Sequence, residues 1–236
     1  DAAERHALDS PAGQYNFQQG GTPGLAPETS DTKSFGIILQ PRFAPGMSLT
    51  VDWFNMTIDG TISTFQPPNT LTACLQNGDA AACSRIHRTA LGQLWLGTGY
   101  VEDLNINIGS LEAEGIDVNF GYNNIAIGNM GSLDFSLVGT YFDKLVTDPG
   151  GGFQPFDCVG AFSGVCGTPT NKWRHMARVH WDTPWDVDLA LGWRYYSGVT
   201  GLVNAANIDA KIPAEQYFDL SANWAVTERA NVVLGT

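Results

Sequence analysis

Apolar and polar residues alternate one by one along several stretches of this chain. In the clearest stretch, Val187, Leu189, Leu191 and Trp193 are separated by Asp188, Ala190 and Gly192. Similar alternation occurs around residues 47–53, 116–122, 132–137, 173–182 and 217–226, with His175 interrupting the apolar series in its stretch. Because successive side chains of a β-strand point to opposite faces, this pattern predicts strands that each have one apolar and one polar face.

The predicted strands are long, and the connections between them alternate in length. Runs near ten residues suit a tilted crossing of a bilayer, which needs roughly 9–11 residues, whereas strands in soluble sandwiches have about five or six. Short connections at 41–46, 124–131, 183–185 and 227–229 alternate with Gly- and Pro-rich segments near 60–105, 148–170 and 198–213. Short turns on one side and long loops on the other are typical of an outer-membrane barrel.

We therefore predict an all-β fold, in which this chain forms an incomplete segment of an antiparallel transmembrane β-barrel with about eight strands. The first strand is expected near Asp31–Gln40 and the last near Ala230–Thr236, with residues 1–30 as an outer loop. An unpaired strand edge is costly in lipid, so we expect another strand to follow the last one.

Composition narrows the class of protein. Charged residues are 15% of the chain, and 12 basic against 24 acidic residues give a net charge of −12, which argues against a nucleic-acid partner. No stretch approaches the ~18 consecutive apolar residues of a spanning helix. The chain begins without the apolar segment of a signal peptide, so we expect a processed chain or a piece of a longer one.

The four cysteines form two close pairs, Cys74 with Cys83 and Cys158 with Cys166, each among small and polar residues. Of the three possible connectivities we favour local pairing within each loop, with four free thiols as the alternative. Neither pair has the spacing or the nearby histidines of a zinc site, so no metal site is expected. Paired loop cysteines indicate an oxidising compartment such as the periplasm or the cell surface.

Two segments carry a family resemblance. Residues 20–31 (GGTPGLAPETSD) resemble the GNP-x-L-x-PE-x-S stretch of TonB-dependent receptors, which leads into a late barrel strand. Residues 107–117 (NIGSLEAEGID) are similar to the family's N-x-G-x-L-x-x-x-GID strand and follow a cysteine-bearing loop. Lys172-Trp173-Arg174 and residues 217–220 stand where such receptors carry comparable residues, so the resemblance extends over most of residues 22–236.

The resemblance implies a barrel of about 22 strands with a plugged lumen in the outer membrane of a Gram-negative bacterium. It also implies uptake of a scarce ligand (a siderophore, glycan or vitamin), driven by the TonB complex through an N-terminal region that this chain lacks. No enzymatic activity and no cofactor are expected. Two alternatives are a self-contained outer-membrane barrel with a structural or adhesive role and a secreted, soluble carbohydrate-binding β-sandwich.

No catalytic motif of a hydrolase, zinc protease or nucleotide-binding protein occurs in the sequence. Glu112 and Glu114 are predicted on one face of a strand and Asp117 on the other, so the three carboxylates are not expected to converge. His175 and His180 are five residues apart and are therefore expected on opposite faces, which argues against a shared metal.

Two groups of residues are candidates for ligand contact. Arg174, Arg178 and Arg194 are predicted on the polar, lumen-facing side, together with Lys172 and His180. They either line the route of an anionic ligand or pair with Asp182, Asp186, Asp188 and acidic residues of the plug. The second group lies in a long loop, where cations and aromatic rings are expected to be exposed: Arg85, His87, Arg88, Trp95 and Tyr100.

Overall fold

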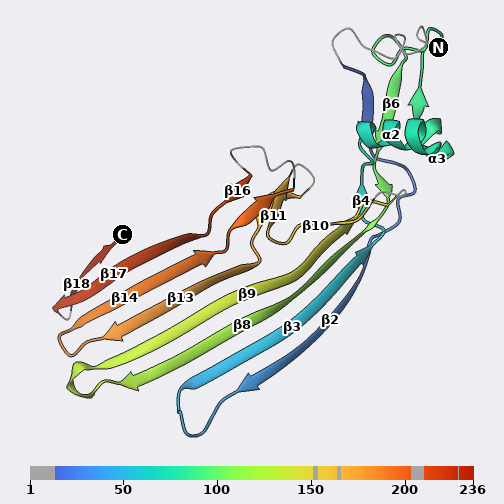
Figure 1. The fold of residues 1–236 in the computed structure, drawn as a ribbon. Coiled ribbons are helices and arrows are strands. Elements are labelled where there is room, and N and C mark those ends of the chain that lie inside the picture. The colour runs from blue at the N-terminus through green and yellow to red at the C-terminus, as the bar shows by residue number, and fades with distance from the viewer. Residues whose placement is uncertain (1–13, 151–153, 164–165, 203–209, 228) are drawn as a thin grey trace. The chain divides into compact units, whose positions relative to one another are not determined.

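The computed structural model describes residues 14–150, 154–163, 166–202, 210–227 and 229–236. The chain divides into two compact units (Figure 1). The loop unit consists of Asp1–Ser30, Ile58–Leu111 and Asp148–Pro155, and the sheet unit consists of Asp31–Thr57, Glu112–Thr147 and Phe156–Thr236. Among the described residues, no helix is both long and apolar enough to cross a membrane.

The sheet unit is built on eight long strands that pair in the order in which they occur along the chain (Figure 1). The strands are β2 (Thr29–Leu39), β3 (Met47–Asp59), β8 (Ser110–Ala126), β9 (Ser132–Asp148), β13 (Trp173–Asp182), β14 (Val187–Tyr196), β17 (Glu215–Thr227) and β18 (Ala230–Gly235). A 3-10 turn, Gly128–Met130, joins β8 to β9. Within the described residues the sheet is open, with β2 and β18 as its edges. The predicted fold class, an incomplete antiparallel barrel segment, is confirmed.

Cross-strand register aligns the alternating residues into two continuous faces. Ala177 of β13 lies between Leu137 of β9 and Trp193 of β14, which places these apolar side chains on one face. The same face continues into β17, where Leu220 is opposite Leu191. Leu220 is 55% exposed, so no described part of the protein covers it. Outer-membrane barrels present an uncovered apolar face of this kind to lipid.

His175 lies on this apolar face because its ring is accommodated by aromatic neighbours. Its Nδ1 atom accepts a hydrogen bond from Nε1 of Trp173 at 2.8 Å. Its ring centroid is 4.5 Å from that of Trp193 and 5.4 Å from that of Tyr195. Gly139 is its partner on β9, where a Cβ atom would lie 2.5 Å from the Trp173 ring, so only glycine leaves room for the indole.

The long connections of the sheet unit contain short strands. They are β10 (Phe156–Asp157), which pairs with β9, and a small sheet of β11 (Ala161–Ser163), β12 (Gly167–Thr170), β15 (Val199–Gly201) and β16 (Lys211–Ile212). The disulfide between Cys158 and Cys166 lies in this region. Asp157 Oδ1 accepts hydrogen bonds from the backbone N–H groups of Leu145 and Val159. These bonds fix β10 against the end of β9.

The loop unit has its own small fold. Its elements are β1 (Phe17–Gly20), β4 (Ile62–Ser63), α2 (Pro67–Asn77), α3 (Ala80–Ser84), β5 (Ile86–His87), β6 (Tyr100–Leu104) and β7 (Ile106–Asn107). Strand β6 pairs in parallel with β1 and antiparallel with β5. The segment predicted as a long loop therefore contains two helices, and the disulfide between Cys74 and Cys83 joins them.

Local sequence explains where these helices begin and end. Pro67 occupies the first turn of α2, where its missing N–H group costs no hydrogen bond, and Gly78 ends the helix in the left-handed conformation. Asp79 then caps α3 by accepting hydrogen bonds from the N–H groups of Ala81 and Ala82. The buried core beneath the helices consists of Phe65, Ala73 and Ala82. Such a small core makes the disulfide an important restraint.

Residues 26–28 belong to the first stretch that resembles the receptor motif. Side-chain hydrogen bonds, in place of backbone pairing, hold them in position. The amide of Asn107 accepts from Ala26 N–H and donates to Ala26 C=O, each at 2.8 Å, and it also donates to Gly60 C=O at 2.8 Å. Glu28 Oε1 accepts from the N–H group of Ile62 at 2.6 Å. Within the loop unit, residues 26–28 are therefore fixed to β4 and β7.

We expect the substitution Asn107→Asp to destabilise this attachment by about 2 kcal/mol, because it removes both donated hydrogen bonds and places a carboxylate against two carbonyl oxygens. Amide hydrogen exchange at residues 24–28 should accelerate about 30-fold. Glu28→Gln is the control, since it removes a charge but keeps an acceptor for Ile62. Equal acceleration in both variants would contradict the role assigned to the Asn107 amide.

Candidate functional site

The loop unit contains the first candidate site, on strands β5 and β6. His87 and Tyr100 are cross-strand partners, and their rings stack with centroids 4.5 Å apart. His87 Nε2 lies 3.3 Å from Glu102 Oε2, which orients the imidazole. Arg85 lies with its guanidinium carbon 5.9 Å from the centroid of the Phe65 ring. Each of these three loop residues predicted to contact ligand therefore has a neighbour that orients its side chain.

The other two residues of this group are placed differently. Arg88 donates from Nη1 to the carbonyl of Gly92 at 3.0 Å, which closes the turn after β5. Trp95 is half-buried, and its side chain makes no polar contact with the other residues that the structure describes. All five residues of the group are half-buried, contrary to the expectation that they would be exposed. The reason is that the segment folds onto its own core, so its cations and rings pack against neighbouring residues.

A buried acid, Asp103, holds together the elements around this site, although the sequence did not indicate it as a candidate. Asp103 is 3% exposed and accepts hydrogen bonds from Gln66 N–H at 3.0 Å and Gln19 Nε2 at 3.2 Å. It therefore connects β1, β6 and the start of α2. Partial burial and, secondly, the charge of Asp103 raise the pKa of Tyr15, so this phenol stays neutral at physiological pH. No sequence signal identified Asp103, because its partners are distant along the chain.

The second candidate site is on the polar face of the sheet unit. Arg174 is opposite Tyr196 in the register of β13 and β14, and Arg194 is opposite Met176. Arg178 lies further along β13, opposite Gly192. All three arginines share the polar face, as predicted from alternation. Arg194 pairs with Asp219, and not with Asp182, Asp186 or Asp188, the acids considered from the sequence.

Two other members of the predicted cationic group have partners of their own. The Lys172 ammonium is 5.4 Å from the centroid of the Tyr141 ring, and Tyr141 is opposite Trp173 on the apolar face. His180 Nδ1 is 3.8 Å from Asp134 Oδ2. Arg174 and Arg194, which line the same hollow, therefore form the cationic part of the candidate site, and Arg178, Lys172 and His180 are outside it.

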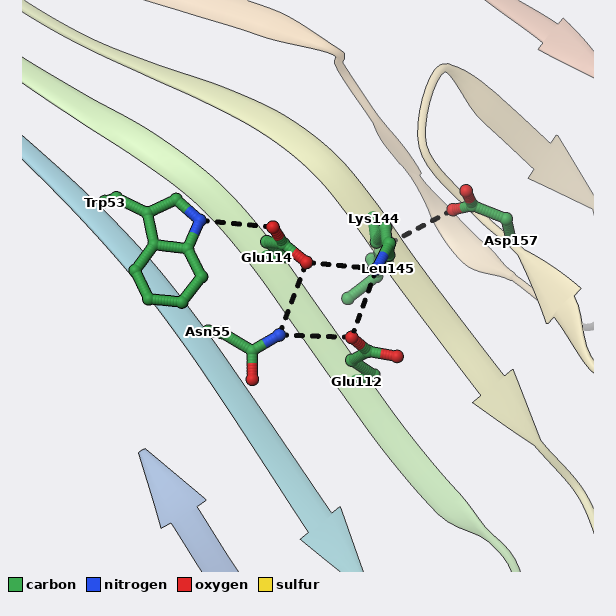
Figure 2. Close-up of polar contacts among 7 residues, drawn as sticks. All are labelled: Trp53, Asn55, Glu112, Glu114, Lys144, Leu145 and Asp157. Carbon is green, nitrogen blue, oxygen red and sulfur yellow. Dashed lines mark hydrogen bonds and ion pairs between the residues drawn. The ribbon is translucent and has the colours of Figure 1, made fainter. Parts of the chain in front are cut away.

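Two of the three acidic residues considered for catalysis, Glu112 and Glu114, belong to a structural network. Figure 2 shows the side chains of Trp53, Asn55, Glu112, Glu114 and Lys144 converging on one face of strands β3, β8 and β9. Lys144 Nζ is 3.5 Å from Glu112 and 3.1 Å from Glu114, and Asn55 donates to both carboxylates.

Asp117 does not join this network and instead accepts a hydrogen bond from Thr140 at 2.7 Å. The described residues contain no group of three or more histidine, cysteine or acidic side chains suited to a metal ion. The polar cluster around Lys144 therefore fits an ion-paired barrel wall.

A long antiparallel sheet with one uncovered apolar face and one polar face defines this chain as a segment of a barrel wall. Residues 3–235 match a family model described as TonB dependent receptor-like, beta-barrel, so the chain belongs to the β-barrel family of TonB-dependent receptors. This is a family of transporters and not of enzymes. No curated protein sequence gave a match.

Solved structures support the same fold. The ferric enterobactin receptor PfeA of Pseudomonas aeruginosa, in complex with enterobactin, has a TM-score of 0.62 at 14% identity, covering 93% of this chain and 27% of that one. The siderophore receptor PirA of Acinetobacter baumannii has a TM-score of 0.56 at 11% identity, covering 92% and 28%. The ferric-catecholate import receptor Fiu of E. coli has a TM-score of 0.53 at 14% identity, covering 96% and 26%.

At these identities the likeness concerns the fold alone. The chain spans 26–28% of the length of these three structures. It does not match a self-contained eight-stranded barrel, because the described sheet is open between β2 and β18.

Proposed function

We propose that this chain is part of an outer-membrane receptor that imports a scarce ligand, with the loop unit contacting the ligand at the outer surface. Family membership over residues 3–235 is the observation that carries the proposal. The solved structures similar to it include receptors named for ferric enterobactin and ferric catecholates, so iron chelates are the first class of cargo to test. Uptake would depend on the TonB complex acting on the plug of the full-length receptor.

The loop unit supports a receptor role because it holds aromatic and cationic groups in fixed positions. The stacked pair of His87 and Tyr100 offers a flat surface, and Arg85, two residues before His87 in the sequence, provides a positive charge. Rings and cations of this kind bind planar, electron-rich ligands. A folded and disulfide-linked support reduces the conformational entropy lost on binding.

The substitution Tyr100→Leu in the full-length receptor tests this proposal. We expect the Kd for ferric enterobactin, measured by fluorescence quenching in detergent, to rise about tenfold, which corresponds to ~1.4 kcal/mol from a lost ring contact. Phe43→Leu is a matched control, because Phe43 is a 90% exposed aromatic residue in the short β2–β3 turn. Unchanged affinity in Tyr100→Leu, or an equal loss in the control, would contradict the role of the loop unit.

If the unmodified receptor does not bind ferric enterobactin at all, the same assay with other iron chelates, glycans and vitamin B12 decides the class of cargo. The absence of binding to every one of these ligands would argue against a receptor function.

A further inference from the structure

The polar face of the sheet unit has a hollow of about 540 Å³ where strands β9, β13 and β14 meet. Its lining includes six side chains of the polar face: Val138, Thr140, Arg174, Met176, Arg194 and Tyr196. This volume is within the range of small-molecule sites, ~300–1,000 Å³. In a barrel of this kind the polar face is directed toward the interior, so the hollow lies on the wall of the lumen.

Arg194 is held in position at the edge of the hollow. Its Nε donates to Asp219 Oδ2 at 3.1 Å and its Nη2 to Oδ1 at 2.9 Å, so the carboxylate fixes the guanidinium with two parallel hydrogen bonds. The guanidinium carbon also lies 5.4 Å from the centroid of the Tyr217 ring. A guanidinium has five N–H donors, so three remain available for another acceptor.

Arg174 is the second cation of the hollow, and the part of the chain that the structure describes provides it with no ion-pair partner. Because Arg194 is opposite Met176, Arg174 and Arg178 are both its diagonal neighbours on the adjacent strand, and of the two only Arg174 lines the hollow. Diagonal neighbours on one face are about 7–8 Å apart at the backbone, which long side chains span readily. Both guanidinium groups can therefore reach one small ligand between them.

The remaining lining groups favour a negatively charged ligand. No carboxylate lines the hollow among the described residues. The Thr140 hydroxyl donates its hydrogen to Asp117, which keeps that acid engaged. Arg194 is paired with Asp219 from outside the lining, whereas Arg174 has no acidic partner among the described residues and supplies the unpaired positive charge.

We propose that this hollow binds one oxyanion group, a carboxylate or phosphate, carried by the imported ligand on its way through the lumen. The inference rests on the proposed import function and adds the charge class of the cargo. Planar guanidinium groups match the two oxygens of such a group with paired hydrogen bonds. Arg194 forms the fixed side of the site, and Arg174 closes on the ligand from the neighbouring strand.

The test uses the purified full-length receptor and two probes, inorganic phosphate and citrate, measured by isothermal titration calorimetry at constant ionic strength. We expect Arg174→Gln to raise the Kd for both probes about tenfold or more. Arg178→Gln is the matched control, since Arg178 is on the same face of the same strand but does not line the hollow. Its Kd should change less than about twofold.

Arg174→Lys provides a second variant that keeps the charge but loses the planar fork, and we expect a Kd between those of the native receptor and Arg174→Gln. Heat-modifiable migration on gels checks that each variant folds. Equal loss in Arg174→Gln and Arg178→Gln would overturn the proposal in favour of diffuse attraction. No binding to the unmodified receptor would overturn it in favour of occupation by another part of the receptor.

Import is scored separately by growth on ferric enterobactin as the iron source. Growth without anion binding refutes the anion site and leaves the proposed function standing. Anion binding without uptake of any cargo refutes the proposed import function but still supports the hollow as an anion-binding site.

Discussion

Replacing Leu220 by arginine is expected to destabilise the folded barrel in lipid by about 2–4 kcal/mol, because it places a charge on the apolar face near the middle of β17. Leu220 is 55% exposed and opposite Leu191, so lipid is the only remaining cover for both side chains in the described structure. The free energy of unfolding should be measured by denaturant titration of the full-length receptor in bilayers.

Ser221 provides the control, since it is the next residue of the same strand and lies opposite Ala190 on the polar face. Ser221→Arg should change the free energy of unfolding by less than about 1 kcal/mol, as expected for a residue that faces the lumen. If the two substitutions were equally costly, the assignment of the apolar face to lipid would fail. If Ser221→Arg alone were costly, the two faces would be reversed.

Removing the disulfide of the loop unit with Cys74→Ser and Cys83→Ser should destabilise that unit by about 2–3 kcal/mol. The bond closes a short segment between α2 and α3, and it restrains a core of only a few buried side chains. Hydrogen exchange in α2 should accelerate about 30-fold or more, and the Kd for a bound iron chelate should rise with it.

Cys158→Ser with Cys166→Ser serves as the comparison, because that disulfide lies in the sheet unit. It should leave hydrogen exchange in α2 unchanged. Acceleration of exchange in α2 by both double variants would indicate that the two units unfold together, contrary to their separate cores. No acceleration by Cys74→Ser and Cys83→Ser would show that packing alone maintains α2 and α3.

The long strands could be predicted closely from the sequence because alternation reports on both faces of a strand. The first predicted strand, Asp31–Gln40, is observed as Thr29–Leu39, and the last, Ala230–Thr236, as Ala230–Gly235. The break in the pattern at His175 was visible, but its explanation was not. The hydrogen bond from Trp173 and the contacts with Trp193 and Tyr195 depend on cross-strand register.

Helices α2 and α3 were not predicted, for a physical reason. They are too short to show a helical period, and they depend on distant groups. The N–H group of Gln66, just before α2, is satisfied by Asp103, 37 residues further along the chain. The same folding explains why Arg85, His87 and Tyr100 are half-buried rather than exposed.

The candidate anion site could be predicted only in part from the sequence. Alternation placed Arg174, Arg178 and Arg194 on one face, which the register bears out. The register makes both Arg174 and Arg178 diagonal neighbours of Arg194, and of these two only Arg174 lines the hollow with it. Alternation within a single strand does not contain that information. The pairing of Arg194 with Asp219 depends in the same way on the register of β14 and β17.

The attachment of residues 26–28 to β4 and β7 has a consequence for how such receptors diversify. Asn107 and Glu28 join residues 26–28 to the segment of residues 58–111 in one compact unit, and β1 pairs with β6 between the same two segments. Recombination that exchanged residues 58–111 alone would separate these partners and leave polar groups unmatched. Because β2 and β3 lie between the two segments in the sequence, the segments are inherited best together with these two strands as a single cassette, which can acquire new ligand preferences while the strands from β8 onward remain the same.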